Sequence, residues 1–258
     1  MSAHLYGAPN GAVCTLPERF ERKYYLAPME TGLALGLLRH VCLPAREYPS
    51  EQVNSLYFDT VDLDQHERSS SGDYLKDKVR IRWYGEDGHL AGMQNVFLEL
   101  KRRRGFAGTK QRVRFQVPAE NLGPSALARG ILPVPVLMER LAKLGYFPSG
   151  LLLPVARISY WRYRFEDILT EQRVALDCRI RSTMVMPEPG NGEHGLELPG
   201  AVLEIKGRSM ELPPALRGAR LLHTDWTRFS KYSACIDAHG ERPGSVGRLS
   251  PSGMVVQP

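Results

Sequence analysis

The sequence has few cysteines and no long apolar run. Its four cysteines, Cys14, Cys42, Cys178 and Cys235, form no CxxC pair and no Cys/His spacing typical of a zinc site. So few scattered cysteines in a chain of 258 residues argue against a secreted disulfide framework. No apolar run approaches the roughly 20 residues of a transmembrane helix, and the first residues lack the charged and apolar regions of a signal peptide. We therefore expect a cytoplasmic protein without a membrane span.

Acidic residues are also in the minority. The chain has 28 Asp and Glu against 34 Lys and Arg, a net charge of +6 at pH 7, and its seven histidines share no metal-ligand spacing. The excess of positive charge lies in strand-like segments and not in a basic tail, which favours a shaped site for an anionic partner. Nucleotides, polyphosphate, nucleic acid and acidic lipid are the candidate partners at this point.

Three neighbouring segments, 78–85, 96–103 and 109–117, alternate between apolar and charged residues. A period of two predicts half-buried β-strands. The polar faces carry Lys78, Arg80 and Arg82 in the first segment, Glu99, Lys101 and Arg103 in the second, and Lys110, Arg112 and Arg114 in the third. Like charges along one face repel one another. The pattern therefore predicts a polyanion lying against a joint basic surface, either on a curved sheet or inside a barrel.

The remaining periodicity completes an α+β fold. Further strands are predicted at 19–26, 52–59, 156–165, 172–181 and 201–207, and helices at 29–42, 136–144 and 227–238, with a short polar turn or helix through Arg68. The expected domain covers residues 17–240, between a flexible tail at 1–16 and a disordered Gly/Pro/Ser-rich tail at 241–258. Closing the eight predicted strands as an antiparallel β-barrel with flanking helices would remove exposed edges.

Seven short motifs carry a family resemblance. They are Glu21-Arg-Lys23, Tyr57-Phe-Asp59, Arg80-Ile-Arg-Trp-Tyr-Gly85, Leu98-Glu-Leu-Lys101, Arg173-Val-Ala-Leu-Asp177, Leu203-Glu-Ile-Lys206 and Phe229-Ser-Lys231. In this order, over roughly residues 18–240, they resemble the VTC-domain polyphosphate polymerases, a branch of the CYTH-like triphosphate tunnel metalloenzyme superfamily. The resemblance implies an eight-stranded antiparallel tunnel whose inward faces carry Lys, Arg and Glu.

One departure from the superfamily pattern helps to identify the branch that the chain resembles. Thiamine-triphosphatase and class IV adenylate-cyclase relatives usually open with Glu-x-Glu-x-Lys, whereas here Arg19 stands in place of the first glutamate and only Glu21 and Lys23 remain. The loss of one carboxylate favours the VTC branch. It leaves Glu204 as the best single metal ligand, with Glu99 and Glu21 as helpers.

The resemblance also implies the other site residues. The expected catalytic set, which binds the reacting phosphates, is Lys23, Arg80, Arg82, Lys101, Arg162, Arg173, Lys206 and Lys231; Lys110, Arg112, Ser230 and Tyr57 are expected to bind substrate. Arginine forks match phosphate oxygens, and a hard divalent ion prefers carboxylate plus phosphate oxygens. Taken singly, each basic residue has a plain alternative as a solvated side chain, and Glu99 as a structural ion pair. Packing is the alternative for Tyr57.

The expected function is a polyphosphate polymerase that uses ATP and Mn²⁺ or Mg²⁺. Two alternatives stay open: hydrolysis of tripolyphosphate or a nucleoside triphosphate by the same fold, and a non-catalytic module that binds polyphosphate, inositol phosphates or RNA. Nucleic acid is the least favoured partner, because RNA platforms pair basic residues with exposed aromatics, and here the aromatics mostly fall on the opposite strand faces. A separate membrane partner is compatible with the resemblance.

Overall fold

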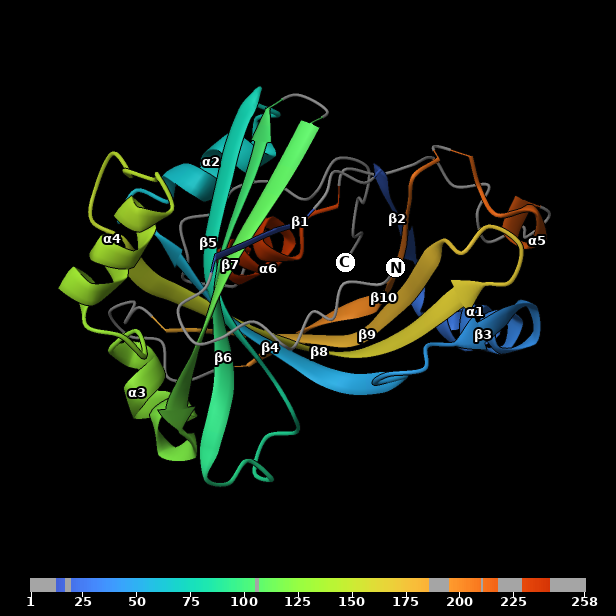
Figure 1. Ribbon diagram of the computed structural model, residues 1–258, viewed down its shortest axis with the longest axis horizontal. Coiled ribbons are helices and arrows are strands. Elements are labelled where there is room, and N and C mark those ends of the chain that lie inside the picture. The colour runs from blue at the N-terminus through green and yellow to red at the C-terminus, as the bar shows by residue number, and fades with distance from the viewer. Residues whose placement is uncertain are drawn as a thin grey trace. The chain divides into compact units, whose positions relative to one another are not determined.

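The chain folds into two compact units. The computed structural model describes residues 13–16, 20–104, 107–185, 195–209, 211–217 and 229–241 (Figure 1). Unit 1 comprises residues 54–157 with 1–18 and 183–194, and unit 2 comprises residues 19–53, 158–182 and 195–258. Strands β4 (Ser50–Asp59) and β8 (Leu153–Asp167) contribute residues to both units. Among the described residues, no helix combines the length and the apolar character that crossing a bilayer requires.

Unit 1 is built on three long strands, β5 (Leu75–Tyr84), β6 (Met93–Arg104) and β7 (Ala107–Pro118). They pair as antiparallel neighbours, with β1 (Val13–Leu16) beyond β7 and β4 beyond β5. In this register Leu98 lies opposite both Ile81 and Val113, and all three are buried in one apolar core. The alternation of the sequence thus puts one face of the three strands into the core and turns the charged residues to the other face.

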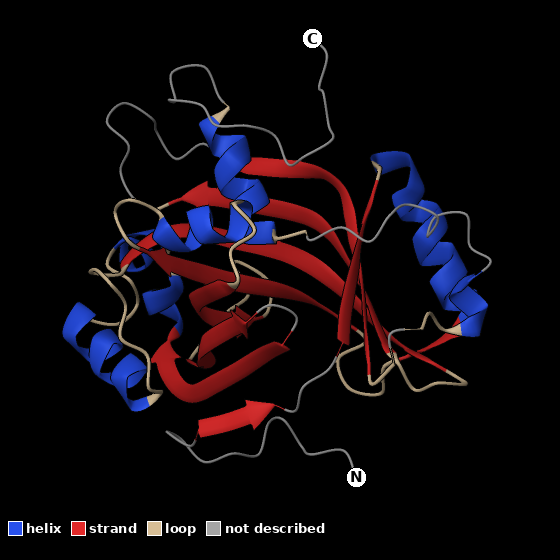
Figure 2. Cartoon of the chain, turned by 90° about the horizontal axis from the view of Figure 1, so that it is seen from above, coloured by secondary structure: helices blue, strands red, loops and turns tan. Residues whose placement is uncertain are grey.

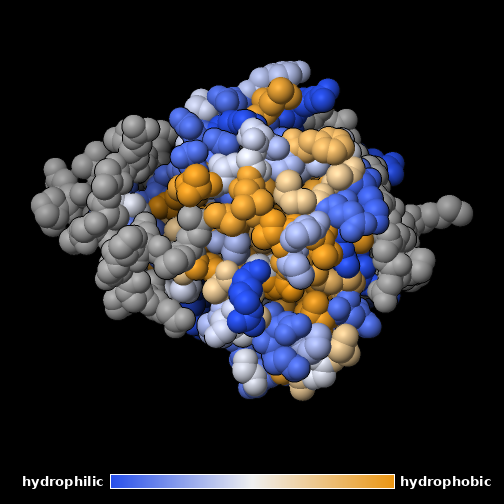
Figure 3. All heavy atoms as spheres, turned by 90° about the vertical axis from the view of Figure 1, so that its left-hand side faces the viewer, coloured by the Kyte–Doolittle hydropathy of each residue, from blue (hydrophilic) through white to orange (hydrophobic). Residues whose placement is uncertain are grey.

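Three helical elements of unit 1 pack on the apolar face. They are the 3₁₀ turn η1 (Ala119–Leu122), α3 (Pro124–Ala128) and α4 (Val134–Lys143). Helix α2 (Asp64–Ser70) instead makes polar contacts with β5, where Gln65 accepts a hydrogen bond from the Val79 amide. Leu137 and Leu141 of α4 enter the core beneath β5, β6 and β7, and Figure 1 shows α3 and α4 on one side of these strands. Apolar side chains also gather on the surface that carries these helices (Figure 3), and the exposed ones in this part of the chain include Phe147 and Leu151.

Unit 2 has the strand order β8-β9-β10-β2, with β9 at Arg173–Met184, β10 at Leu196–Gly207 and β2 at Phe20–Leu26. A short strand β3 (Cys42–Pro44) pairs with β8. Helix α1 (Pro28–Val41) buries Ala34 and Leu38 in a core with the apolar face of β9 and β10. The unit ends with α5 (Pro214–Arg217) and α6 (Lys231–Gly240).

A bulge in β10 sets which side chains face that core. The register between β9 and β10 shifts between Leu198 and Ala201, and Gly200 has a φ of +75°. Beyond the bulge, Ala201, Leu203 and Ile205 are buried among apolar neighbours. Residues alternate across a strand, so Glu204 and Lys206 face the opposite side.

These observations confirm an antiparallel α+β fold with flanking helices (Figure 2). The expected closure into an eight-stranded barrel is not found: within the described segments the sheet has ten strands, and its hydrogen-bonded order runs from β1 to β2 without a pairing that closes it. Alternation specifies the two faces of each strand, but it does not specify whether the end strands meet. This is why closure did not follow from the sequence.

The predicted strands and long helices occur where expected, to within a few residues. The short elements β1, β3, η1, α3 and α5 were not predicted. The helix expected at 227–238 begins at Lys231, with Ser230 as its N-cap. Residues 227–228, most of the tails at 1–16 and 241–258, and Arg19 lie outside the described residues. The domain limits of 17–240 stay a prediction.

Replacing Gly200 with Ala should destabilise the fold. A Cβ at this position would lie 2.1 Å from the carbonyl oxygen of Leu26, and the backbone φ of +75° is one that Ala adopts poorly. The left-handed conformation alone costs about 1–2 kcal/mol, and the clash adds to it. Gly88→Ala is the matched control, because its φ is +83° but no atom lies within 4 Å of the added carbon. Urea unfolding should show a larger loss of stability for Gly200→Ala, and equal losses would contradict the assigned clash.

Candidate functional site

A buried carboxylate organises the charged face of unit 1. We call Glu99 with Arg80, Arg82, Lys110 and Arg112 the Glu99 cluster. The Glu99 side chain is only 1% exposed. Arg80 Nη2 and Lys110 Nζ each lie 2.7 Å from one of its oxygens, while Arg112 Nε is at 3.7 Å and Arg82 Nη1 at 3.9 Å. Four cations from the two strands that flank β6 therefore surround one carboxylate.

Strand register explains this convergence. Glu99 lies opposite Arg80 of β5 on one side and Arg112 of β7 on the other. Two residues along β6, Lys101 lies opposite Lys78 and Lys110 in the same way. We call Lys78, Lys101 and Lys110 the lysine row. Like charges directly opposite one another destabilise a sheet; Lys110 reaches Glu99 in the neighbouring row, and Lys78 donates to Ser69 Oγ at 2.9 Å.

The arginines of the Glu99 cluster are held by further contacts. Arg80 Nη1 donates to the Tyr57 hydroxyl at 2.8 Å, and Arg82 Nε donates to Ser55 Oγ at 3.1 Å. The Arg112 guanidinium carbon lies 3.7 Å from the centre of the Phe97 ring. Within the described part of the chain, Nε and Nη2 of Arg112 are buried and make no hydrogen bond. Phe97 thus fixes a guanidinium that still has donors to offer.

Charge and burial shift the pKa values in this cluster. Burial raises the pKa of Glu99, but Lys110 and the three arginines outweigh burial and hold that pKa well below its ordinary value. For Lys110, burial lowers the pKa; Glu99 opposes this, and Arg80, Arg82 and Arg112 reinforce it. The result is a Lys110 pKa of about 7. An anion bound here would favour the charged form of this lysine.

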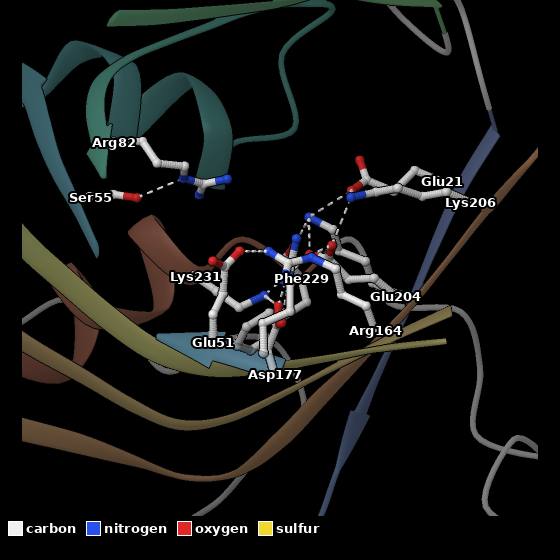
Figure 4. A network of polar contacts seen from close by, with 12 residues as sticks. Glu21, Glu51, Ser55, Arg82, Arg164, Asp177, Glu204, Lys206, Phe229 and Lys231 are labelled. Carbon is white, nitrogen blue, oxygen red and sulfur yellow. Dashed lines mark hydrogen bonds and ion pairs between the residues drawn. The ribbon is translucent and has the colours of Figure 1, made fainter. Parts of the chain in front are cut away.

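Unit 2 has a second buried carboxylate with four cations. We call Glu204 with Lys23, Arg162, Lys206 and Lys231 the Glu204 cluster (Figure 4). Arg162 Nη2 and Lys206 Nζ are both 2.9 Å from Oε2 of Glu204, and Lys231 Nζ and Lys23 Nζ are 3.2 and 3.8 Å from Oε1.

Two more carboxylates flank this cluster. Asp177 is fully buried and accepts hydrogen bonds from Nε and Nη2 of Arg162 at 2.6 and 2.7 Å. Lys231 Nζ lies 2.6 Å from Oδ2 of Asp177. On the other side, Glu21 lies 3.2 Å from Lys206 Nζ. The Glu204 cluster is therefore closer to charge balance than the Glu99 cluster.

The same register logic applies in unit 2. Glu204 lies opposite Lys23 of β2 and Ala175 of β9, and Lys206 lies opposite Glu21 and Arg173. Lys231 comes from the first turn of α6, whose N-cap Ser230 accepts the Ser233 amide through its side chain. Arg164, outside the cluster, pairs with Glu51.

The pKa values in unit 2 respond to the same balance. Burial raises the pKa of Glu204, but Lys206, Lys231, Arg162 and Lys23 together bring it well below the ordinary value. Burial lowers the pKa of Lys231, yet Asp177 and then Glu204 raise it overall. Lys231 thus stays charged and joins the two carboxylates to α6.

The structure places the predicted site residues in these two groups. Unit 1 brings together Tyr57, Arg80, Arg82, Glu99, Lys101, Lys110 and Arg112; unit 2 brings together Glu21, Lys23, Arg162, Arg173, Glu204, Lys206, Ser230 and Lys231. Ser230 already serves as a helix cap, so its predicted phosphate contact stays a prediction. The other predicted roles in binding and catalysis are likewise untested.

Two participants were not assigned a role from the sequence. Asp177 was part of a quoted motif, and its place on the charged face of an alternating strand was the available signal. Lys78 belonged to the basic pattern, but only register shows that it lies opposite Lys101.

The carboxylates suit a hard divalent ion only in part. The described residues contain no group of three or more His, Cys, Asp or Glu side chains arranged to hold a metal. Glu204 and Glu21 do share Lys206 and Lys23 as neighbours. Mg²⁺-type ions are often held by one or two carboxylates plus substrate phosphates. This pair fits such a site once phosphate oxygens complete it.

Comparisons with known proteins give one strong match. The family model described as the VTC domain matches residues 18–239. A search among curated proteins finds no match. A Bacillus halodurans protein described with its crystal structure as a "putative adenylate cyclase" shares 18% identity over 76% of this chain and 82% of that chain, with a TM-score of 0.45. The Schizosaccharomyces pombe Mediator head module shares 11% identity over 76% of this chain and 84% of that chain, with a TM-score of 0.31. Both structural likenesses are too weak to bear on the site.

The pKa of Lys110 predicts a pH-dependent stability. It is lowered from 10.5 to about 7, so between these values the unfolded chain binds a proton that the folded chain lacks. The free energy of unfolding therefore gains a contribution that rises with pH across this window. Lys110→Met should lose that rise in urea unfolding measured at several pH values. Lys143→Met, which removes an exposed lysine of α4, should keep it. Equal slopes for both variants would show that Lys110 titrates normally.

Proposed function

Because its VTC domain spans residues 18–239, the chain belongs to the VTC-domain family, and we propose that it is a divalent-metal-dependent polyphosphate polymerase. In the proposed reaction, the γ-phosphate of ATP is transferred to the end of a growing inorganic polyphosphate chain. ADP leaves, and the polyphosphate becomes one unit longer.

The lysine row is the observation that carries this proposal. Lys78, Lys101 and Lys110 lie opposite one another on three strands, directly beside the row that contains Arg80, Glu99 and Arg112. Successive rows on one face of a strand are about 6.6–6.8 Å apart. A chain of phosphates laid along the strands would contact the cations of both rows. A linear polyphosphate would also offset the repulsion among the lysines.

The side chains of this face suit the chemistry of phosphoryl transfer. Such transfer depends mainly on positioning and on stabilising charge, with little covalent chemistry for the protein. In the proposal, Arg80, Arg82 and Arg112 act as forks for phosphate oxygens, and the lysines act as movable point charges. An oxygen of the terminal phosphate attacks the γ-phosphorus as the bond to the β-phosphate oxygen breaks. No enzyme nucleophile takes part.

Glu204 and Glu21 would hold the divalent ion, Mn²⁺ or Mg²⁺. When bound, the ion would neutralise charge on the phosphate oxygens of the substrate. Lys206, Lys23, Lys231 and Arg162 already screen these carboxylates. In the proposal, the substrate phosphates take over part of this screening when ion and substrate bind together.

Product analysis tests the proposed activity. Purified protein incubated with ATP and Mn²⁺ should produce long chains that stain as polyphosphate on a gel, together with ADP. Chelation of the metal should abolish both. Orthophosphate and ADP without chains would overturn the polymerase in favour of a hydrolase of the same fold. Absence of turnover, with polyphosphate still bound, would leave a binding module.

A substitution in the lysine row tests whether this row binds the phosphate chain. Lys101→Met keeps the aliphatic stem and removes the charge. A charge-assisted contact contributes about 1.5–3 kcal/mol, so the Kd for polyphosphate should rise roughly ten- to a hundredfold. The dependence of binding on salt should become weaker as well. Titration calorimetry would measure both.

The matched control is Lys143→Met, since Lys143 is an exposed lysine that pairs with Glu139 on α4. It should leave the Kd unchanged. Equal affinities for the two variants would remove the lysine row from the phosphate site.

A further inference from the structure

Helix α1 of unit 2 exposes apolar residues on the side turned away from its own core. Ala34 and Leu38 are buried, whereas Met29 is 85% exposed and Leu33 is 67% exposed. The outward side of a surface helix is ordinarily polar. Over its fourteen residues, α1 has only Glu30 near its start and Arg39 and His40 near its end as charged or titratable side chains.

Two glycines lie on the same outward side. Gly32 and Gly36 sit inside the helix, where glycine is a poor helix former. A Cβ added at either position would meet no atom within 4 Å. Among the described residues of unit 2, no contact therefore requires glycine at these two positions. Glycine does allow a second backbone to come close, which gives these positions a purpose if α1 has a partner.

The outward residues form a stripe along α1, the seam, that is complementary to the same stripe of a second, antiparallel copy. Met29, Leu33, Gly36 and His40 are spaced by four, three and four residues, as in the contact positions of a coiled coil. Reversing the helix about its midpoint puts Leu33 opposite Gly36 and Met29 opposite His40. We propose that two copies of this chain pair through α1, antiparallel about a two-fold axis, with each Leu33 seated over Gly36 of the other copy.

Shape and charge favour a second copy in this orientation. A two-fold interface uses the same patch twice and so requires self-complementarity, which the seam has. Antiparallel pairing brings the end that carries Arg39 and His40 near the end that carries Glu30. A parallel pair would set the basic ends against one another.

The exposed apolar surface continues past the end of α1. Leu43 lies on β3, whose Cys42 pairs with Asp167 of β8, and Ile168 and Leu169 directly follow that strand. These three side chains are more than half exposed. A seam of four residues is small for a stable dimer, and this extension supplies more apolar area. The interface uses no residue of the Glu99 or Glu204 clusters, so it is independent of the proposed catalytic function.

Disulfide trapping tests the pairing and its direction. Met29→Cys and His40→Cys are made separately in the full chain with Cys14→Ala; Cys42, Cys178 and Cys235 are buried. Under mild oxidation, a mixture of the two variants should form cross-linked dimer at least about tenfold faster than either variant alone. Faster cross-linking of one variant with itself would indicate a parallel pair and overturn the proposal. Equally slow cross-linking in all three samples would overturn it too.

Sedimentation of the full chain tests the proposed seat for Leu33. Gly36→Leu fills it, and should raise the dimer Kd at least about tenfold without lowering the Tm, since leucine is a better helix former than glycine and a Cβ there meets no described atom within 4 Å. Glu139→Leu adds the same side chain at an exposed position of α4 and should leave the Kd unchanged. A wild-type chain that stays monomeric would refute the pairing. So would α1-dependent binding of that monomer to phosphatidylserine vesicles, because the face would then meet lipid.

Discussion

A buried carboxylate surrounded by cations is the interaction on which both charged faces depend. Burying one charge is costly unless it is paired, and both Glu99 and Glu204 are paired with several cations. Each draws four cations from neighbouring elements. Without Glu99, the arginines and lysines of β5, β6 and β7 would only repel one another. The carboxylate thus allows a basic surface to fold before any phosphate is present.

The two clusters differ in how far carboxylates balance the charge of their cations. In unit 2, Asp177 takes the fork of Arg162 and the ammonium of Lys231, and Glu21 contacts Lys206. These extra carboxylates fix the cations and tie α6 to the sheet. In unit 1, Lys110 has a pKa of about 7 because burial and three arginines outweigh Glu99. The unit 1 face therefore has the greater need for an anion, which agrees with its assignment to the phosphate chain.

Helix α1 differs from the strands in how its sequence relates to its surroundings. Along β5, the alternation accounts for the buried apolar residues Val79, Ile81 and Trp83 and for the charged residues between them. Along α1, Gly32 and Gly36 lower the helix propensity, and no contact among the described residues of unit 2 requires a glycine there. Local choices that conflict with a fold often mark a functional requirement outside it. Pairing between two copies supplies such a requirement.

The sequence by itself determined the strands, their faces and the VTC family, because alternation and short motifs are local properties. It also named both central carboxylates and their cations, all of which lie on strands except Lys231 of α6. Only the tertiary structure decided that Lys78 and Lys110 flank Lys101, that Asp177 holds Lys231, and that the sheet order stays open. Register, bulges such as that at Gly200 and the pairing of end strands depend on contacts between residues far apart in the chain. The period of a single strand carries no information about those contacts.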